Sequence, residues 1–101
     1  MTDRATTYHP QMLTDMEWYR DHDQRTGRRA VALIEDTVAH PENGLGLPKK
    51  LRDLANVWSR RVTAHHRLYY LLTSECLRFI SCRDHDIPQH IYEAIRERGD
   101  A

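Results

Sequence analysis

The sequence predicts an α+β fold, in which two N-terminal helices pack against a twisted antiparallel sheet of three to four strands and a short C-terminal helix follows. Hydrophobic residues recur at helical spacing in residues 10–39 and at every second position in residues 57–83. A loop rich in proline and glycine separates the two parts. Because two helices precede consecutive strands, the order differs from the alternation of a parallel α/β sheet. A chain of 101 residues has room for one compact domain.

The helical part contains two predicted helices joined by a short turn. The first begins at Pro10, because proline is favoured at the first helical position, where its missing N–H costs nothing. It ends near Asp21. The second begins after Asp23, whose carboxylate can accept hydrogen bonds from the free N–H groups of the first turn. Its expected buried stripe consists of Ala30, Val31, Ile34 and Val38.

The strands follow a loop at residues 41–48, which holds two prolines and two glycines and cannot continue a helix. Residues beyond it are β-branched and aromatic and predict strands at 57–62, 66–73 and 76–83. Only Ser74 and Glu75 separate the last two, so we expect a tight hairpin there. Residues 4–8 tolerate a β conformation as well.

The end of the chain predicts a short helix. Asp86 offers a capping side chain with Gln89 three positions later, which is typical of a helix start. The apolar residues that follow form a narrow stripe of Ile87, Ile91, Ala94 and Ile95. The stripe predicts a helix with one buried face.

Charge is unevenly distributed along the chain, although fifteen Lys and Arg balance fifteen Asp and Glu. Residues 49–67 contain six cations against the single acid Asp53, a local net charge of +5. The other residues therefore carry a net charge of −5. A basic centre of this kind indicates a polyanionic partner despite the neutrality of the whole chain.

No apolar run approaches the ~20 residues that a membrane span needs, and the start MTDRATT lacks the apolar region of a signal peptide. We therefore expect a cytoplasmic protein with no membrane partner. The cysteines lack the spacing of a zinc site, and we expect neither a metal nor a cofactor.

Three segments carry a resemblance to a known family. They are Trp58-Ser59-Arg60-Arg61-Val62-Thr63, His66-Arg67-Leu68-Tyr69-Tyr70 and Cys82-Arg83-Asp84-His85. In order and spacing they resemble the YoeB/Txe group of bacterial toxins in the RelE/ParE superfamily. The loop pattern Gly44-x-Gly46-x-Pro48 fits the same template, so the resemblance covers about residues 5–86.

The resemblance implies a RelE/YoeB-like fold and the toxin of a type II toxin–antitoxin system. Such a toxin is a ribosome-dependent endoribonuclease, which binds in the 30S A site and cuts mRNA through attack of the 2′-hydroxyl on the adjacent phosphate, without a metal. It is neutralised by a cognate antitoxin, usually of the YefM/Phd type. The oligomeric state stays open, a homodimer included.

The resemblance also assigns candidate site residues. Arg61 and Arg67 match positions that contact the scissile phosphate, a task suited to the paired donors of a guanidinium. On spacing alone, a solvated face with cross-strand partners is the favoured interpretation for both, and the resemblance reverses that preference. His85 matches a histidine that serves as general acid or as donor to the phosphate, and histidine titrates near neutral pH. The expected RNA-binding residues are Lys50, Arg52, Arg60 and Arg83.

Two positions depart from the family pattern. Lys49 stands where the family carries a glutamate that is regarded as the general base, and Asp86 stands where it carries a tyrosine. Because neighbouring positive charges disfavour the protonated form of a lysine, Lys49 is a candidate base or a phosphate clamp. The alternative, which the sequence favours equally, is that Lys49, Lys50 and Arg52 only hold ribosomal RNA. Glu42 is a weaker candidate base.

Aromatic residues beside the cations raise the question of base stacking. Trp58 points away from Arg61 at strand spacing, and we expect it to pack on the helices instead. The spacing leaves open whether Tyr69 or Tyr70 stacks on a base.

Other functions stay open at this point. One is a non-catalytic member of the superfamily, either a ParE-like inhibitor of DNA gyrase or a decayed toxin that only binds antitoxin or ribosome. Residues 1–86 form the predicted toxin domain, and residues 87–101 form an extension without a match in the family pattern. The extension could cover a sheet edge or lie over the basic centre and restrain it.

Overall fold

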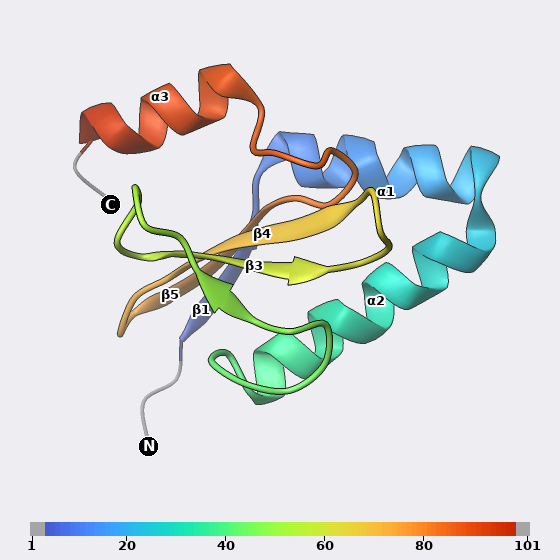
Figure 1. Cartoon of the computed structure of the whole chain (residues 1–101), viewed down its shortest axis with the longest axis horizontal. Helices are drawn as coiled ribbons and strands as arrows, with labels where there is room; N and C mark the ends of the chain where they lie inside the picture. Colours follow the sequence, from blue (N-terminus) through green and yellow to red (C-terminus); the bar gives the residue numbers. More distant parts are fainter. Residues whose placement is uncertain (1–3, 99–101) are drawn as a thin grey trace.

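The computed structural model describes residues 4–98 and confirms the α+β class. The elements in chain order are β1 (Ala5–Tyr8), α1 (Pro10–His22), α2 (Gln24–Ala39), β2 (Lys49–Lys50), β3 (Val57–Arg61), β4 (Arg67–Leu72), β5 (Cys76–Ser81) and α3 (Gln89–Arg98) (Figure 1). Residues 1–3 of the predicted domain and 99–101 of the predicted extension lie outside the described residues.

The sheet has five strands rather than three or four, in the order β1-β5-β4-β3-β2. The three predicted strands are confirmed as β3, β4 and β5, which pair antiparallel as expected. β1 pairs parallel to β5, so the sheet is mixed. β1 lies within residues 4–8, which were noted only as tolerant of a β conformation, and β2 was not predicted. Both are short edge strands with mostly exposed side chains, which leave no hydrophobic period to detect.

The N-terminal helices confirm the predicted turn at Asp23, whose carboxylate accepts a hydrogen bond from the backbone N–H of Thr26 at 3.2 Å. The predicted stripe of α2 is partly wrong, since Val31 and Val38 are 44% and 51% exposed. The buried residues of α2 are Gly27, Ala30, Leu33 and Thr37. A side chain at position 27 would start 3.0 Å from the Tyr19 Cβ, so the glycine lets α1 and α2 approach closely and sets the rotation of α2.

Two hydrophobic cores lie on opposite faces of the sheet. The first packs α1 and α2 on one face and includes Met12, Tyr19, Leu33, Tyr70 and Phe79 among its buried members, with Trp58 packed against it as expected. The second is formed by Leu54, Val57, Tyr69, Ile80, Ile91 and Ile95. The helices α1 and α2 therefore cover one face, and α3 covers only a part of the other (Figure 1).

The placement of α3 differs from both roles considered for the extension. Ile91 and Ile95 seat the helix on the face of the sheet, whereas the sheet edges are β1 and β2. Lys49, Lys50 and Arg61 remain exposed, so α3 does not cover them.

Within residues 4–98, no helix is both long and apolar enough to cross a lipid bilayer.

Candidate functional site

A groove of about 280 Å³ lies on the sheet face opposite α1 and α2. Its walls come from β2 and the residues after it, from β3 and β4, and from the loop that follows β5. The lining residues are Lys49, Lys50, Leu51, Arg52, Ser59, Arg67, Tyr69, His85 and Asp86. The structure thus brings together five of the predicted site residues from three separate segments: Lys49, Lys50, Arg52, Arg67 and His85.

Arg61 and Arg67 are direct partners across β3 and β4, so their side chains leave the sheet on the same face. Like charges directly opposite each other destabilise a sheet. Within residues 4–98, neither side chain forms an ion pair with a carboxylate. Arg67 lines the groove and Arg61 is exposed beside it. Two unneutralised guanidinium groups at one point are typical of a site for an anion.

His85 is held in place by its backbone rather than by its ring. The Tyr69 hydroxyl donates a hydrogen bond to the His85 carbonyl at 2.6 Å, and the Arg67 backbone N–H donates to the Asp84 carbonyl at 3.3 Å. Burial raises the pKa of Tyr69, which keeps its hydroxyl a donor. The ring itself is exposed, with Nδ1 lying 3.5 Å from a carboxylate oxygen of Asp86. The backbone of His85 is therefore fixed while its ring stays exposed in the groove.

Lys49 is positioned by the loop that precedes β2. The Gly46 carbonyl accepts a hydrogen bond from the Arg61 N–H at 2.7 Å, which fixes the loop against β3. Gly46 has a φ of +78°, and a Cβ there would lie 3.0 Å from the Arg61 carbonyl oxygen, so only glycine fits without strain. Leu47 also has a positive φ, of 55°. The loop then delivers Lys49 opposite Ser59, on the groove face.

Arg60 was expected to bind RNA, and the structure contradicts this because its side chain is fully buried under α2. The guanidinium donates hydrogen bonds to the Asp36 carboxylate at 2.6 Å, to the Tyr70 hydroxyl at 3.3 Å, and to the carbonyls of His40, Asn43 and Leu45 at 2.5, 3.0 and 3.0 Å. Arg60 alternates with Arg61 along β3 and so faces the helices. It holds the loop that carries Lys49.

Arg83 does not line the groove either. Its guanidinium lies over the ring of Trp18 in α1, 3.8 Å from the ring centroid. Because β5 ends at Ser81, the two-residue strand period does not continue through the loop that carries Arg83 and His85, and of these two only His85 lines the groove. Glu42, the weaker candidate base, is exposed on its loop and lines other hollows than the groove.

Sequence reasoning missed three groove residues, Leu51, Ser59 and Asp86. Ser59 was detectable, because it shares the two-residue period of Arg61. Asp86 was noted as a candidate helix cap and as a departure from a family pattern, yet it contributes the one carboxylate among the residues that line this groove. In the described part of the chain, no three His, Cys, Asp or Glu side chains gather closely enough to hold a metal ion.

Comparison with known proteins gives a consistent family match. Residues 8–86 match the sequence model of the YoeB-like toxins of bacterial type II toxin–antitoxin systems. The Escherichia coli K12 toxin YoeB is 38% identical over 72 residues, which are 70% of this chain and 86% of that protein.

Solved structures agree with the sequence match. A YoeB/ParE toxin from Agrobacterium tumefaciens has a TM-score of 0.74 at 33% identity, covering 80% of this chain and 98% of that one. A YoeB dimer from Staphylococcus aureus has a TM-score of 0.73 at 26% identity, covering 82% and 98%. A heterotetrameric YoeB–YefM complex from the same organism has a TM-score of 0.71 at 26% identity, covering 83% and 99%.

Proposed function

The chain belongs to the YoeB-like toxins of bacterial type II toxin–antitoxin systems, and from this premise we propose that it is a ribosome-dependent endoribonuclease. It cuts mRNA in the 30S A site and thereby inhibits translation. The observation that carries the proposal is the directly opposed pair Arg61 and Arg67, unneutralised on the open face beside the groove of Lys49 and His85.

The reaction needs no group outside the chain and its substrate. The 2′-oxygen of the RNA attacks the adjacent phosphorus as its proton leaves, and the bond from phosphorus to the 5′-oxygen breaks as that oxygen takes up a proton. The products are a 2′,3′-cyclic phosphate and a free 5′-hydroxyl. The intervening phosphorane carries extra negative charge, which Arg61 and Arg67 stabilise with charged hydrogen-bond donors.

The remaining groove residues transfer protons or bind phosphate. His85 gives a proton to the departing 5′-oxygen or donates to the phosphate, since its exposed imidazole lines the groove and can act as an acid or as a hydrogen-bond donor. Lys49 receives the proton of the 2′-hydroxyl or clamps the phosphate. Lys50 and Arg52 bind neighbouring phosphates of the strand, as cations beside a cleavage site do.

The partners proposed for this chain follow from its relatives. A Staphylococcus aureus relative is described in complex with YefM, and another structure as a dimer. We infer a cognate antitoxin of the YefM/Phd type, a homodimer as the free form, and action in the cytoplasm on ribosomes.

Primer extension on ribosomes that carry a defined mRNA tests the proposed activity. The wild-type protein should give cuts in phase with the codons. Because Arg67 stabilises the charge that develops in the transition state, Arg67→Ala should lower the cleavage rate by about 10²–10³-fold. His85→Ala should lower it comparably. Arg25→Ala, which removes an exposed cation from α2, is the matched control and should cut like wild type. Absence of cuts with wild type, or inhibition of gyrase supercoiling instead, would overturn the proposal.

The role of Lys49 is separable by a charge-preserving change. An arginine at this position keeps the positive charge but cannot give up its proton. If Lys49 is the base, Lys49→Arg should lose most of the single-turnover cleavage rate while ribosome binding is unchanged. If Lys49→Arg cleaves at the wild-type rate, Lys49 is not the base, and only its role as a phosphate clamp is left.

A further inference from the structure

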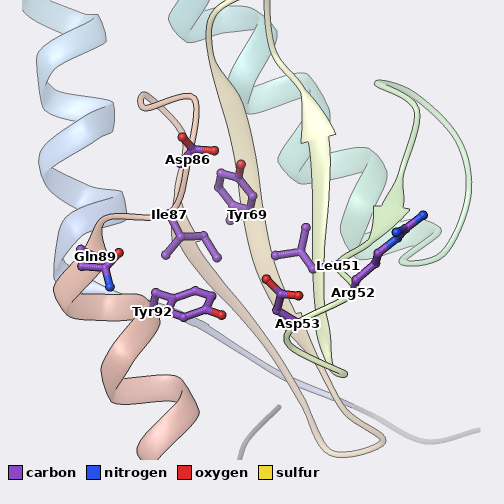
Figure 2. Close-up of a pocket in the computed structure, with 8 residues that line it drawn as sticks. All are labelled: Leu51, Arg52, Asp53, Tyr69, Asp86, Ile87, Gln89 and Tyr92. Carbon is purple, nitrogen blue, oxygen red and sulfur yellow. The ribbon is translucent and has the colours of Figure 1, made fainter.

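A second cavity, of about 460 Å³, adjoins the groove. The two share Leu51, Arg52, Tyr69 and Asp86, so they form one continuous depression. The far wall of the cavity is built by Ile87, Gln89 and Tyr92, at the start of the C-terminal extension (Figure 2). These wall residues lie beyond residues 8–86, which match the family. The cavity is therefore a feature of this chain's own extension.

The cavity combines an apolar interior with a polar rim. Leu51, Tyr69, Ile87 and Tyr92 all pack within the second core, which fixes their positions. In Figure 2, Asp86 lies near Tyr69 at one end and Asp53 lies near Tyr92 at the other, while the side chain of Arg52 points away. The rim thus presents carboxylates at both ends. Those carboxylates disfavour a phosphate inside the cavity and favour a neutral ligand that carries N–H donors.

We propose that this cavity binds a nucleobase of the mRNA next to the scissile phosphate, with the base stacked on Tyr92 and its N–H groups donating to Asp53. The inference rests on the proposed function and adds a specificity site to it. Single-stranded RNA is commonly read in this way, with the backbone held by cations and a splayed base held between aromatic side chains and hydrogen-bonded along its edge. The groove supplies the cations, and the adjoining cavity supplies apolar and aromatic walls.

The chemistry of the rim sets a preference among bases. An ionised carboxylate only accepts hydrogen bonds, and adenine, cytosine and guanine each present an exocyclic amino group. Uracil has no exocyclic amino group and can donate only through N3–H, which lies between two carbonyl oxygens that a carboxylate repels. The cavity therefore selects amino-bearing bases over uracil at the position that it contacts.

Binding of 2′-O-methyl trinucleotides, which cannot be cleaved, tests the cavity independently of catalysis. Titrations followed by NMR should show tighter binding when the flanking base carries an amino group than when it is uracil. Tyr92→Ala should weaken binding about 5- to 100-fold, while Tyr92→Phe, which keeps the ring, should bind like wild type. Asp53→Asn should reduce the discrimination against uracil. Glu97→Gln makes the same chemical change at an exposed site on α3 and serves as the control.

The outcomes separate this inference from the proposed activity. If wild type cleaves ribosome-bound mRNA but binds all trinucleotides equally, or if Tyr92→Ala leaves binding and the choice of cleavage site unchanged, the base site is wrong and the nuclease stands. If the trinucleotides bind with the expected preference but no mRNA is cut, the base site stands and the nuclease proposal fails.

Discussion

Arg60 and Arg61 are neighbours in β3, yet one lies in a closed polar centre and the other on an open cationic face. Arg60 is fully buried and its guanidinium is surrounded by one carboxylate, one hydroxyl and three carbonyls. Arg61 is exposed and faces Arg67 across the strand pair. The difference shows that the pleat of one strand places the same side chain either in a buried polar centre or on an exposed cationic face, according to the side of the sheet on which it falls.

The buried centre serves the open face. Arg60 ties the loop of residues 40–46 to α2 and β4, and the end of that loop delivers Lys49 to the groove. The Tyr70 hydroxyl adds a hydrogen bond of 2.6 Å to the carbonyl of Pro41. Burial raises the pKa of Tyr70, so its hydroxyl stays protonated and able to donate. The cations of the groove are placed by a set of polar contacts that a substrate never touches.

The largest expected difference between Arg60 and Arg61 is in how much each contributes to the stability of the fold. Arg60→Met removes five hydrogen bonds and leaves buried carbonyls and the Asp36 carboxylate without their partner, which should lower the free energy of unfolding by about 3–5 kcal/mol. Arg61→Met is the matched control at the adjacent exposed position and should not lower stability, because it also removes one of the two charges that oppose each other across β3 and β4. Urea unfolding followed by circular dichroism measures the stability of both variants. Similar unfolding midpoints would show that the buried Arg60 stabilises the fold no more than the exposed Arg61. If Arg60→Met does not fold, Arg60→Lys should fold with reduced stability.

A smaller effect is expected in the pH dependence of stability, through the Asp36 carboxylate that pairs with Arg60. The Leu45 backbone N–H, at 2.9 Å, and the Arg60 guanidinium lower the pKa of Asp36. Because the pKa in the folded state lies below that of the unfolded chain, the contribution of Asp36 is full above the unfolded value near 4 and is lost as pH falls through the folded value. Asp36→Asn should therefore be less stable than wild type at pH 7, with a difference that shrinks below about pH 4.

Urea midpoints at pH 7, 5 and 3 measure this change. Glu35→Gln, at an exposed neighbouring position on α2, should show no comparable narrowing. A gap between wild type and Asp36→Asn that stays constant down to pH 3 would mean that the ionised carboxylate does not support the centre.

Much of the fold could be predicted because its signals are local. The cap at Asp23 and the hairpin at Ser74 and Glu75 follow from turn and capping chemistry, and β3 to β5 follow from hydrophobic period. β1 and β2 could not be predicted, because a short edge strand is defined by a neighbour's hydrogen bonds and not by its own side chains. The buried stripe of α2 was misjudged for a similar reason, since the contact of Gly27 with Tyr19 is tertiary.

The site was predictable where a strand carried it. Arg61 and Arg67 follow from a family resemblance, and their register places both side chains on one face of the sheet. The two-residue strand period would have turned Arg60 toward the helices, but the block of cations concealed that distinction. The cavity beside α3 could not be predicted, because it forms between residues 51–53 and residues 86–92, whose contact depends on the whole sheet between them.

The smallest predicted effect tests whether the open face is built for function at some cost to stability. Arg67→Gln removes one of two like charges that oppose each other across β3 and β4, and it keeps a polar, though shorter, side chain. The free energy of unfolding should rise by about 0.2–1 kcal/mol, and more at low than at high salt, because the repulsion that it relieves is screened. The same variant should cut ribosome-bound mRNA far more slowly than wild type. Higher stability together with slower cleavage would distinguish a charge pair that binds an anionic substrate from an exposed pair without a function. A variant that loses both stability and cleavage would instead place Arg67 with Arg60, as a residue that supports the fold.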